Sequence, residues 1–366
     1  MIRATTFGVL ALSLAMLSGG VSGGCSQGEG VPPGDGATDL GDAPSGDGFD
    51  PTMGDGDGGV VVPSTPPAAT SAVRIIVEPS DRGQALVDAI RAARTKVHVT
   101  MYLLTWSTVI DALAAQARAG REVRVVLNQH FPPGVTGSPN QTAYDTLTQA
   151  GAQVRWAPST FTYTHEKCVI VDGATAWIMT MNAAASAPTD NREYLAVDTD
   201  SDDVAEAEAI FTADFEGRAI TPTGKLVVAP VNARPKLVGI IASAKTTLSL
   251  EGEELSDRAI VDALAARAAA GVATTVVLPS TGANQAQDQA VARLKAAGAR
   301  VIGLDRPYVH AKAVVVDGVL GYVGSENFST GSLLYNRELG VVLGAAAAVR
   351  AVADTIAGDA AAGTPL

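Results

Sequence analysis

The sequence predicts an α/β protein made of two similar halves in tandem, each with a mixed sheet flanked by helices. From Val73 onward, short β-branched runs alternate with Ala-rich segments of helical period, a pattern typical of layered α/β folds. The segment IDALAA at 110–115 returns as VDALAA at 261–266, and a motif of His, Lys and Asp also occurs twice. Such a long period indicates one duplicated fold, because solenoid repeats are much shorter.

The first 25 residues are a predicted signal peptide. Arg3 precedes an apolar run, Phe7–Leu17, that is too short to span a membrane. The segment VSGGC, ending at Cys25, resembles the bacterial lipoprotein box, in which the cysteine becomes the lipidated first residue. We therefore expect an exported lipoprotein anchored to the cell envelope through Cys25, with a secreted or periplasmic protein as the alternative.

Residues 26–72 predict a disordered acidic linker rich in Gly, Pro and Asp, because they have too few apolar side chains to offset chain entropy. The linker holds eight acidic residues and no Lys or Arg, so of the net charge of −12 about −5 remains on residues 73–366. The folded part therefore lacks the basic stripe of proteins that hold nucleic acid by its phosphates. The second cysteine, Cys168, has no partner once Cys25 is acylated, and no disulfide is expected.

The two halves are predicted at residues 73–220 and 221–366. Apolar periodicity in the first half indicates strands and helices in alternation. The predicted strands are 74–77, 96–103 and 123–127, and the predicted helices are 83–93 and 109–118. The second half repeats this order.

Each half contains one copy of the motif H-x-K-x4-D, followed at matching distances by two asparagines and a glutamate. The first copy is His165, Lys167, Asp172, Asn182, Asn191 and Glu193, and the second is His310, Lys312, Asp317, Asn327, Asn336 and Glu338. In a strand, residues two apart project from the same face, so the His and Lys of each copy point together. An Asp-Gly turn then ends each strand.

This set of side chains suits phosphoryl transfer. One neutral imidazole can attack as a nucleophile while the other donates a proton to the leaving group. The lysines and the asparagine amides suit the charged oxygens of the transition state. Glu193 and Glu338 are expected to accept a hydrogen bond from the second nitrogen of each imidazole. Lysines stand where a metal site would cluster carboxylates, so we expect no metal and no cofactor.

The paired motifs, with Gly324-Ser325-Glu326-Asn327 and Glu338 behind the second, resemble the signature of the phospholipase D superfamily. The resemblance implies one active site at a pseudo-twofold interface between the halves. It also implies metal-independent cleavage of a phosphodiester through a covalent phosphohistidine. By position, His165 resembles the nucleophile and His310 the general acid.

The resemblance assigns the other positions as well. Lys167, Lys312, Asn182 and Asn327 match phosphate-binding positions, Thr180 and Ser325 stand beside them as further substrate-binding residues, and Asp172 and Asp317 belong to the catalytic motif and match residues that hold its local structure. The first copy departs from the pattern because Met179 replaces Gly324. The bulkier Met179 is expected to narrow that side of the pocket.

Several polar residues near the motifs keep two interpretations. Glu253 and Glu254 belong to a solvated loop or to a head-group rim, and Arg192 and Arg337 are exposed or contact the phosphate. For Tyr163 and Tyr308, packing is the favoured interpretation and a pocket wall is the alternative. For His98 and His130, a structural role is favoured, and a place at the pocket mouth is the alternative for His130.

The leading function is hydrolysis of phospholipid head groups by a membrane-tethered, monomeric enzyme of the phospholipase D type. An endonuclease of the same superfamily is an alternative that the mildly acidic charge disfavours. A phosphatidyltransferase similar to cardiolipin synthases is another. The last is a catalytically silent binding module, which the intact motifs disfavour.

Overall fold

The computed structural model describes residues 66–282 and 284–366. The predicted signal peptide, Cys25 and residues 26–65 of the predicted linker lie outside the described residues. The end of that linker is described and has tertiary contacts. The backbone N–H of Thr70 donates to the carbonyl of Val342 at 2.9 Å, and Thr70 is buried. Packing of the described chain against the second half therefore begins before Val73.

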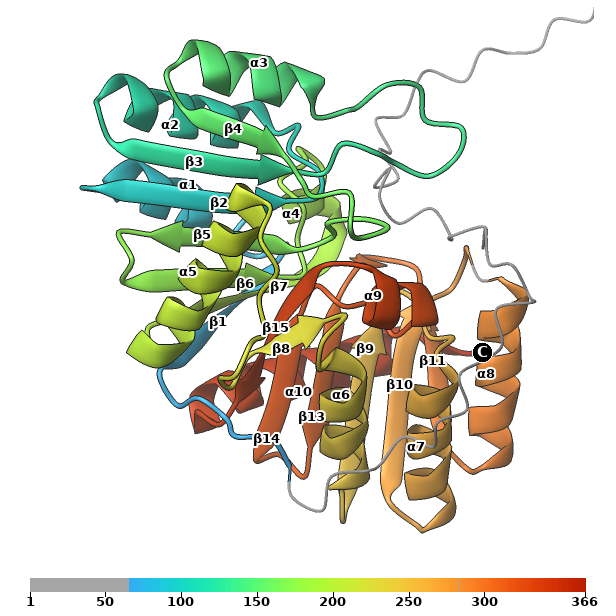
Figure 1. Cartoon of the computed structure of the whole chain (residues 1–366). Helices are drawn as coiled ribbons and strands as arrows, with labels where there is room; N and C mark the ends of the chain where they lie inside the picture. The colour runs from blue at the N-terminus through green and yellow to red at the C-terminus, as the bar shows by residue number, and fades with distance from the viewer. Residues whose placement is uncertain (1–65, 283) are drawn as a thin grey trace, which may run out of the picture. The chain divides into compact units, whose positions relative to one another are not determined.

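The first half forms one sheet with helices along it (Figure 1). Its elements are β1 (Val73–Glu78), α1 (Gln84–Ala92), β2 (Lys96–Met101), α2 (Ser107–Arg118), β3 (Glu122–Leu127), α3 (Gln141–Gln149), β4 (Gln153–Trp156), β5 (Lys167–Val171), β6 (Thr175–Met179), α4 (Ala187–Asp190), β7 (Asn191–Asp198) and α5 (Ser201–Glu216). The five elements predicted between residues 74 and 127 are all present, with ends shifted by one or two residues.

The second half repeats the architecture. Its elements are β8 (Val227–Ala229), α6 (Ala233–Ala242), β9 (Thr247–Gly252), α7 (Arg258–Ala269), β10 (Ala273–Pro279), α8 (Gln285–Ala296), β11 (Arg300–Leu304), β12 (Tyr308–Val309), β13 (Lys312–Val316), β14 (Leu320–Gly324), α9 (Thr330–Tyr335), β15 (Glu338–Leu343), α10 (Ala346–Ala362) and β16 (Thr364–Pro365).

The strand orders of the two sheets correspond. The first sheet runs β1-β7-β6-β5-β2-β3-β4, and the second runs β8-β15-β14-β13-β9-β10-β11-β16. In both, three neighbouring strands are parallel, β2, β3 and β4 in the first sheet and β9, β10 and β11 in the second. The next strand, β5 or β13, is antiparallel to them. The predicted pair of mixed sheets flanked by helices is confirmed.

The central strand of each sheet ends in the predicted tight turn. Asp172 and Gly173 have φ angles of 56° and 62°, and Asp317 and Gly318 have 52° and 67°. Two successive residues with positive φ match the right-handed twist of the strands of a hairpin. The turn fixes the antiparallel pairing of β5 with β6 and of β13 with β14.

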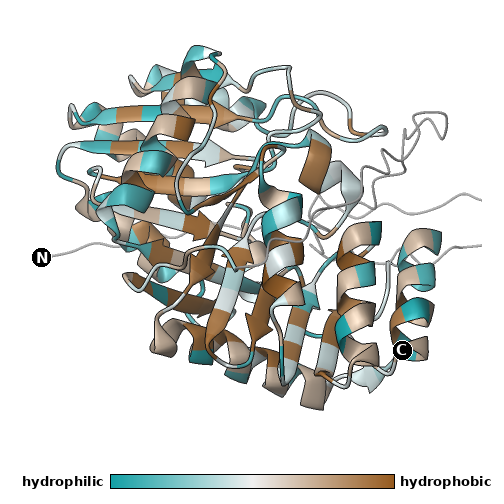
Figure 2. Cartoon of the chain, turned by 60° about the horizontal axis from the view of Figure 1, so that its bottom comes forward, coloured by the Kyte–Doolittle hydropathy of each residue, from teal (hydrophilic) through white to brown (hydrophobic). Residues whose placement is uncertain are grey.

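Three apolar clusters form the core. One lies between the first sheet and helices such as α1 and α2, and another between the second sheet and helices such as α6 and α7. The third contains side chains of both sheets together with α5 and α10. Figure 2 shows this pattern as brown, apolar segments concentrated on the strands. The sheets are apolar on both faces because both faces are covered. Within residues 66–282 and 284–366, no helix is long and apolar enough to cross a membrane.

Candidate active site

The two motifs meet where the halves exchange backbone hydrogen bonds. Thr164, just before β5, forms a parallel bridge with Arg337, and Tyr308 of β12 pairs with Asn191 of β7. The N–H of His165 donates to the carbonyl of Arg337 at 2.9 Å. Each motif histidine therefore lies on a segment that borders the Asn-Arg-Glu segment of the other half.

Each histidine is paired with the glutamate of the other half. Nδ1 of His165 lies 2.9 Å from Oε1 of Glu338, and Nδ1 of His310 lies 2.7 Å from Oε1 of Glu193. All four side chains are buried. A carboxylate at Nδ1 accepts its proton and orients the ring, so that Nε2 is the nitrogen available for chemistry. The crossed pairs bring residues of the two motif copies into direct contact.

Hydroxyl groups hold the two glutamates in place. Thr180 donates to Glu193, and Ser325 donates to Oε2 of Glu338 at 2.7 Å. Ser332 of α9 donates to Oε1 of Glu338 at 2.7 Å. Sequence reasoning assigned Thr180 and Ser325 to the substrate. The structure places their hydroxyls on the carboxylates that orient the histidines.

Each lysine folds back over the histidine of its own copy. Nζ of Lys167 lies 2.6 Å from Nε2 of His165 and 2.9 Å from its carbonyl oxygen. Nζ of Lys312 lies 3.2 Å from Nε2 of His310 and 2.8 Å from its carbonyl oxygen. Both lysines are fully buried at 0% exposure. The predicted pairing of His and Lys on one strand face gives each reactive nitrogen an adjacent positive charge.

Asn182 and Asn327 follow the ends of β6 and β14 and are both buried, at 0% and 5% exposure. They hold corresponding places behind Thr180 and Ser325. Their predicted phosphate contact stays a prediction.

Asp172 and Asp317 lie at the other end of the central strands, about 17 Å along the chain from the lysines by the rise of a strand. Asp172 accepts from the backbone N–H groups of Arg94, Thr95 and Lys96. Burial alone would raise its pKa, but these hydrogen bonds lower it to about 2, and Asp317 likewise has a pKa of about 2. Both aspartates hold the start of the neighbouring strand, which agrees with the structural role that the resemblance implied. Neither contacts an imidazole.

Met179 does not narrow the pocket as expected. It is fully buried in the apolar cluster on the outer side of the first sheet. Successive residues of a strand point to opposite faces. Since Thr180 points to Glu193, Met179 must point away from the site.

The two copies differ at the residue that follows β2 in the first half and β9 in the second. In the first half it is Tyr102, whose ring lies 5.2 Å from Nζ of Lys167 and 4.6 Å from the ring of His165. In the second half it is Glu253, which is buried at 4% exposure. The solvated-loop interpretation of Glu253 is therefore wrong. Sequence reasoning missed Tyr102, although the repeat spacing aligns it with Glu253.

Arg192 and Arg337 are neither exposed nor placed on a phosphate site. Arg337 forms a two-point ion pair with Asp214 of α5, at 2.8 and 3.1 Å. Arg192 pairs in the same way with Asp359 of α10, at 2.5 and 2.9 Å. Each pair joins the two halves and occupies corresponding positions in the repeat.

The two remaining histidines are His98, which has the structural role that was favoured, and His130. His98 stacks on Phe211 at 4.5 Å and contacts the carboxylates of Glu122 and Glu208. His130 is exposed, and its carbonyl accepts from Asn128. Tyr163 packs edge-on against Tyr102, as favoured.

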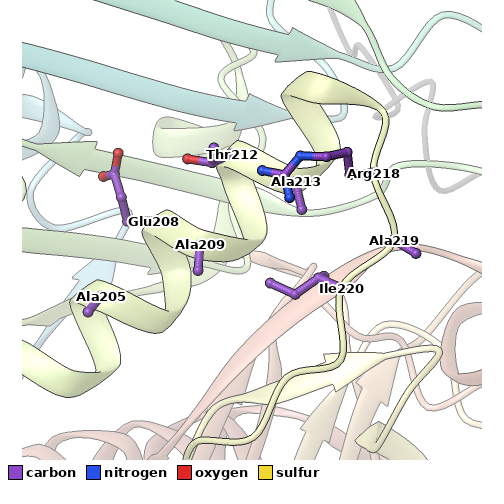
Figure 3. Close-up of a pocket in the computed structure, with 8 residues that line it drawn as sticks. All are labelled: Ala205, Glu208, Ala209, Thr212, Ala213, Arg218, Ala219 and Ile220. Carbon is purple, nitrogen blue, oxygen red and sulfur yellow. The ribbon is translucent and has the colours of Figure 1, made fainter.

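A hollow along α5 is separate from the motif residues (Figure 3). It is lined by Ala205, Glu208, Ala209, Thr212, Ala213, Arg218, Ala219 and Ile220. Its lining includes none of the predicted site residues.

Comparisons with known proteins agree with this architecture. The phosphatidylserine synthase of Haemophilus influenzae superposes with a TM-score of 0.61, at 11% identity, over 82% of this chain and 89% of that one. The polyphosphate kinase of Porphyromonas gingivalis gives a TM-score of 0.61, at 16% identity, over 78% of this chain. This chain spans 46% of that kinase. Both likenesses show the fold.

No curated protein sequence matches the chain. The family described as "Cardiolipin synthase, PLD-like domain" matches residues 86–215 and 237–359, one segment in each half. These two segments cover more than half of the sequence, and both contain the motif residues described above. The chain therefore belongs to this PLD-like domain family, within the phospholipase D superfamily.

Proposed function

We propose that the protein is a metal-independent phosphodiesterase that acts through a phosphohistidine and hydrolyses the head-group bond of phospholipids. The observation that carries the proposal is the crossed pairing of His165 with Glu338 and of His310 with Glu193. With Nδ1 paired, Nε2 of each histidine is the nitrogen left for chemistry, and it lies beside the lysine of its own copy.

In the first step, Nε2 of His165 attacks phosphorus and forms an N–P bond. The P–O bond to the head-group alcohol breaks, and His310 donates the proton that this alcohol needs to leave. Glu338 stabilises the positive charge that develops on His165, since it lies 2.9 Å from Nδ1. Lys167 and Lys312 offset the negative charge of the equatorial oxygens.

In the second step, His310 is neutral and accepts a proton from water. The resulting hydroxide attacks phosphorus, the N–P bond breaks, and the phosphomonoester leaves while His165 returns to its starting state. The sum is diester plus water giving monoester plus alcohol. Glu193, at 2.7 Å from Nδ1 of His310, holds that ring in one orientation through both proton transfers.

Two observations and one prediction from the sequence support a phospholipid substrate. The family description names a lipid-modifying synthase. The charge of about −5 on residues 73–366 disfavours a polyanionic nucleic acid. The predicted lipid anchor at Cys25 would hold the enzyme at a membrane of the cell envelope, where its substrate lies.

A second candidate is transfer of the phosphatidyl group to an alcohol instead of to water. The family description and the fold shared with a phosphatidylserine synthase favour it. The same phosphohistidine serves both reactions, because only the acceptor in the second step differs.

The test offers the full chain three substrates in the presence of a chelator: phosphatidylcholine in mixed micelles, the same micelles with glycerol, and single- and double-stranded DNA. Release of choline with formation of phosphatidate supports hydrolysis. Phosphatidylglycerol as the main product would establish transfer. Cleavage of DNA without lipid turnover would overturn the lipid proposal, and loss of all activity with the chelator would overturn metal independence.

A further inference from the structure

Tyr102 and Glu253 hold the same place in the two halves. The N–H of Tyr102 donates to the carbonyl of Glu166 at 3.2 Å, and the N–H of Glu253 donates to the carbonyl of Ala311 at 3.1 Å. In each half, the accepting residue stands between the motif His and Lys. The side chain after β2 or β9 therefore lies against the reactive pair, and it is neutral in one half and acidic in the other.

Glu253 is held within the second copy of the motif. Its Oε2 lies 3.0 Å from Nζ of Lys312 and 3.5 Å from Nε2 of His310. Its Oε1 accepts a hydrogen bond from the hydroxyl of Tyr308 at 3.0 Å. Tyr308 belongs to β12, whose backbone pairs with β7 of the first half. Contacts from two directions fix the position of this carboxylate.

The carboxylate of Glu253 lies where a negative charge repels a bound phosphate most strongly. A phosphoryl oxygen that binds Nζ of Lys312 and approaches Nε2 of His310 must come next to Oε2 of Glu253, which already contacts both atoms. The carboxylate offsets the positive charge of Lys312 at that point. Since the site is buried, little water screens the repulsion between the carboxylate and a phosphate.

We propose that Glu253 is a specificity-determining residue that restricts the site to phosphate groups with a single negative charge. A phosphodiester has one negative charge, whereas a phosphomonoester loses its second proton near pH 6 and has almost two at neutral pH. Glu253 repels the second form about twice as strongly. This inference rests on the proposed phosphodiesterase function and extends it to the charge of the substrate.

The same repulsion acts on the product. Hydrolysis converts a singly charged diester into a monoester, and the monoester then gains a second charge. Glu253 therefore favours release of the product over rebinding. The first half, with Tyr102 at this place, keeps the attraction that binds the substrate.

The test compares the full chain with its Glu253→Gln variant, which removes the charge and keeps the size. Inorganic phosphate near pH 8 is the probe, measured by calorimetry and as a competitive inhibitor of bis-p-nitrophenyl phosphate hydrolysis. The variant should bind phosphate at least about tenfold more tightly, while the KM of the diester falls by a smaller factor. Asp354→Asn, at an exposed position of α10, removes the same charge elsewhere and should leave phosphate binding unchanged.

Glu253→Tyr, which introduces the residue of the first half, should act in the same direction, and thermal unfolding checks that both variants fold. Phosphate affinity within twofold of the wild type in both folded variants, or no phosphate binding by any of the proteins, would overturn the inference. A lower kcat with unchanged phosphate affinity would also overturn it and make Glu253 part of proton transfer instead. The calorimetric comparison stands even if bis-p-nitrophenyl phosphate is not turned over, so the inference and the proposed function fail separately.

Discussion

The two halves of the chain have the same strand order and the same motif, yet they differ beside the reactive groups. Glu193 and Glu338 correspond, and so do the ion pairs Arg192–Asp359 and Arg337–Asp214. All of these groups reach into the other half. Tyr102 and Glu253 each contact the lysine of their own half, and they differ. The residues that reach into the other half correspond in the two copies, whereas this pair, which contacts the lysine of its own half, differs.

Replacing each histidine by alanine is the strongest way to break the symmetry. Both His165→Ala and His310→Ala should lower kcat on phosphatidylcholine by on the order of 10³-fold or more. A p-nitrophenyl leaving group needs no proton, so the first step should recover in the His310 variant and not in the His165 variant. The second step still lacks its base in the His310 variant, so the recovery should appear as a burst of p-nitrophenol, measured by pre-steady-state kinetics. Rescue of the His165 variant instead would reverse the two roles.

The buried arginines test whether the exchanged ion pairs hold the halves together equally. Arg337→Met leaves Asp214 buried without its partner and should cost about 3–5 kcal/mol in free energy of unfolding. Arg192→Met should cost less, because Arg192 is 14% exposed against 3% for Arg337. Urea unfolding measures both. Equal costs would show that exposure does not separate the pairs.

Glu166, whose counterpart in the second half is Ala311, should make the stability of the protein depend on pH. Burial, and after it the charges of Asp214 and Glu338, raise the pKa of Glu166 from 4.5 to about 8. The unfolded chain therefore releases this proton first, and stability falls as the pH rises from about 4.5 to about 8. Glu166→Gln lacks this loss and should gain stability relative to the wild type over that range. Urea unfolding at both ends checks it, and a constant difference would contradict it.

Replacing the two crossed glutamates should impair different roles in the reaction, because each glutamate orients a different histidine. Glu193→Gln and Glu338→Gln should each lower kcat by about 100-fold. The p-nitrophenyl substrate should rescue the first step of Glu193→Gln, seen as a burst of p-nitrophenol, because Glu193 orients His310, the proton donor of that step. The first step of Glu338→Gln should stay impaired. The opposite pattern would mean that each glutamate serves the histidine of its own half.

The two aspartates should have the smallest effect, and it should be on stability. Asp172→Ala and Asp317→Ala each leave backbone N–H groups of the neighbouring strand without their acceptor and should cost about 1–3 kcal/mol. At temperatures where the variants remain folded, kcat/KM should be near that of the wild type. A large fall in kcat for either variant would show that the replaced aspartate takes part in the reaction.

The fold could be predicted from the sequence because strand and helix periodicity are local signals, and because the repeat shows that the second half copies the first. The motif also predicted which His and Lys lie together. Periodicity carries no information on which half supplies each glutamate, so the crossing of Glu193 and Glu338 came from the structure. The same holds for Thr180 and Ser325, whose hydroxyls have two acceptable partners until the sheet is built. Glu253 was left between two interpretations, because its burial depends on β12 from a distant part of the chain.

The crossed pairs have a consequence for how such a site can arise. A dimer of two identical half-length chains could form both His–Glu pairs, since the exchange is symmetric. It would also have the same side chain beside both lysines. A tyrosine on one side and a glutamate on the other require two copies whose sequences can differ. Because the two copies are separate segments of one polypeptide, one phosphate site can have an attracting side and a repelling side.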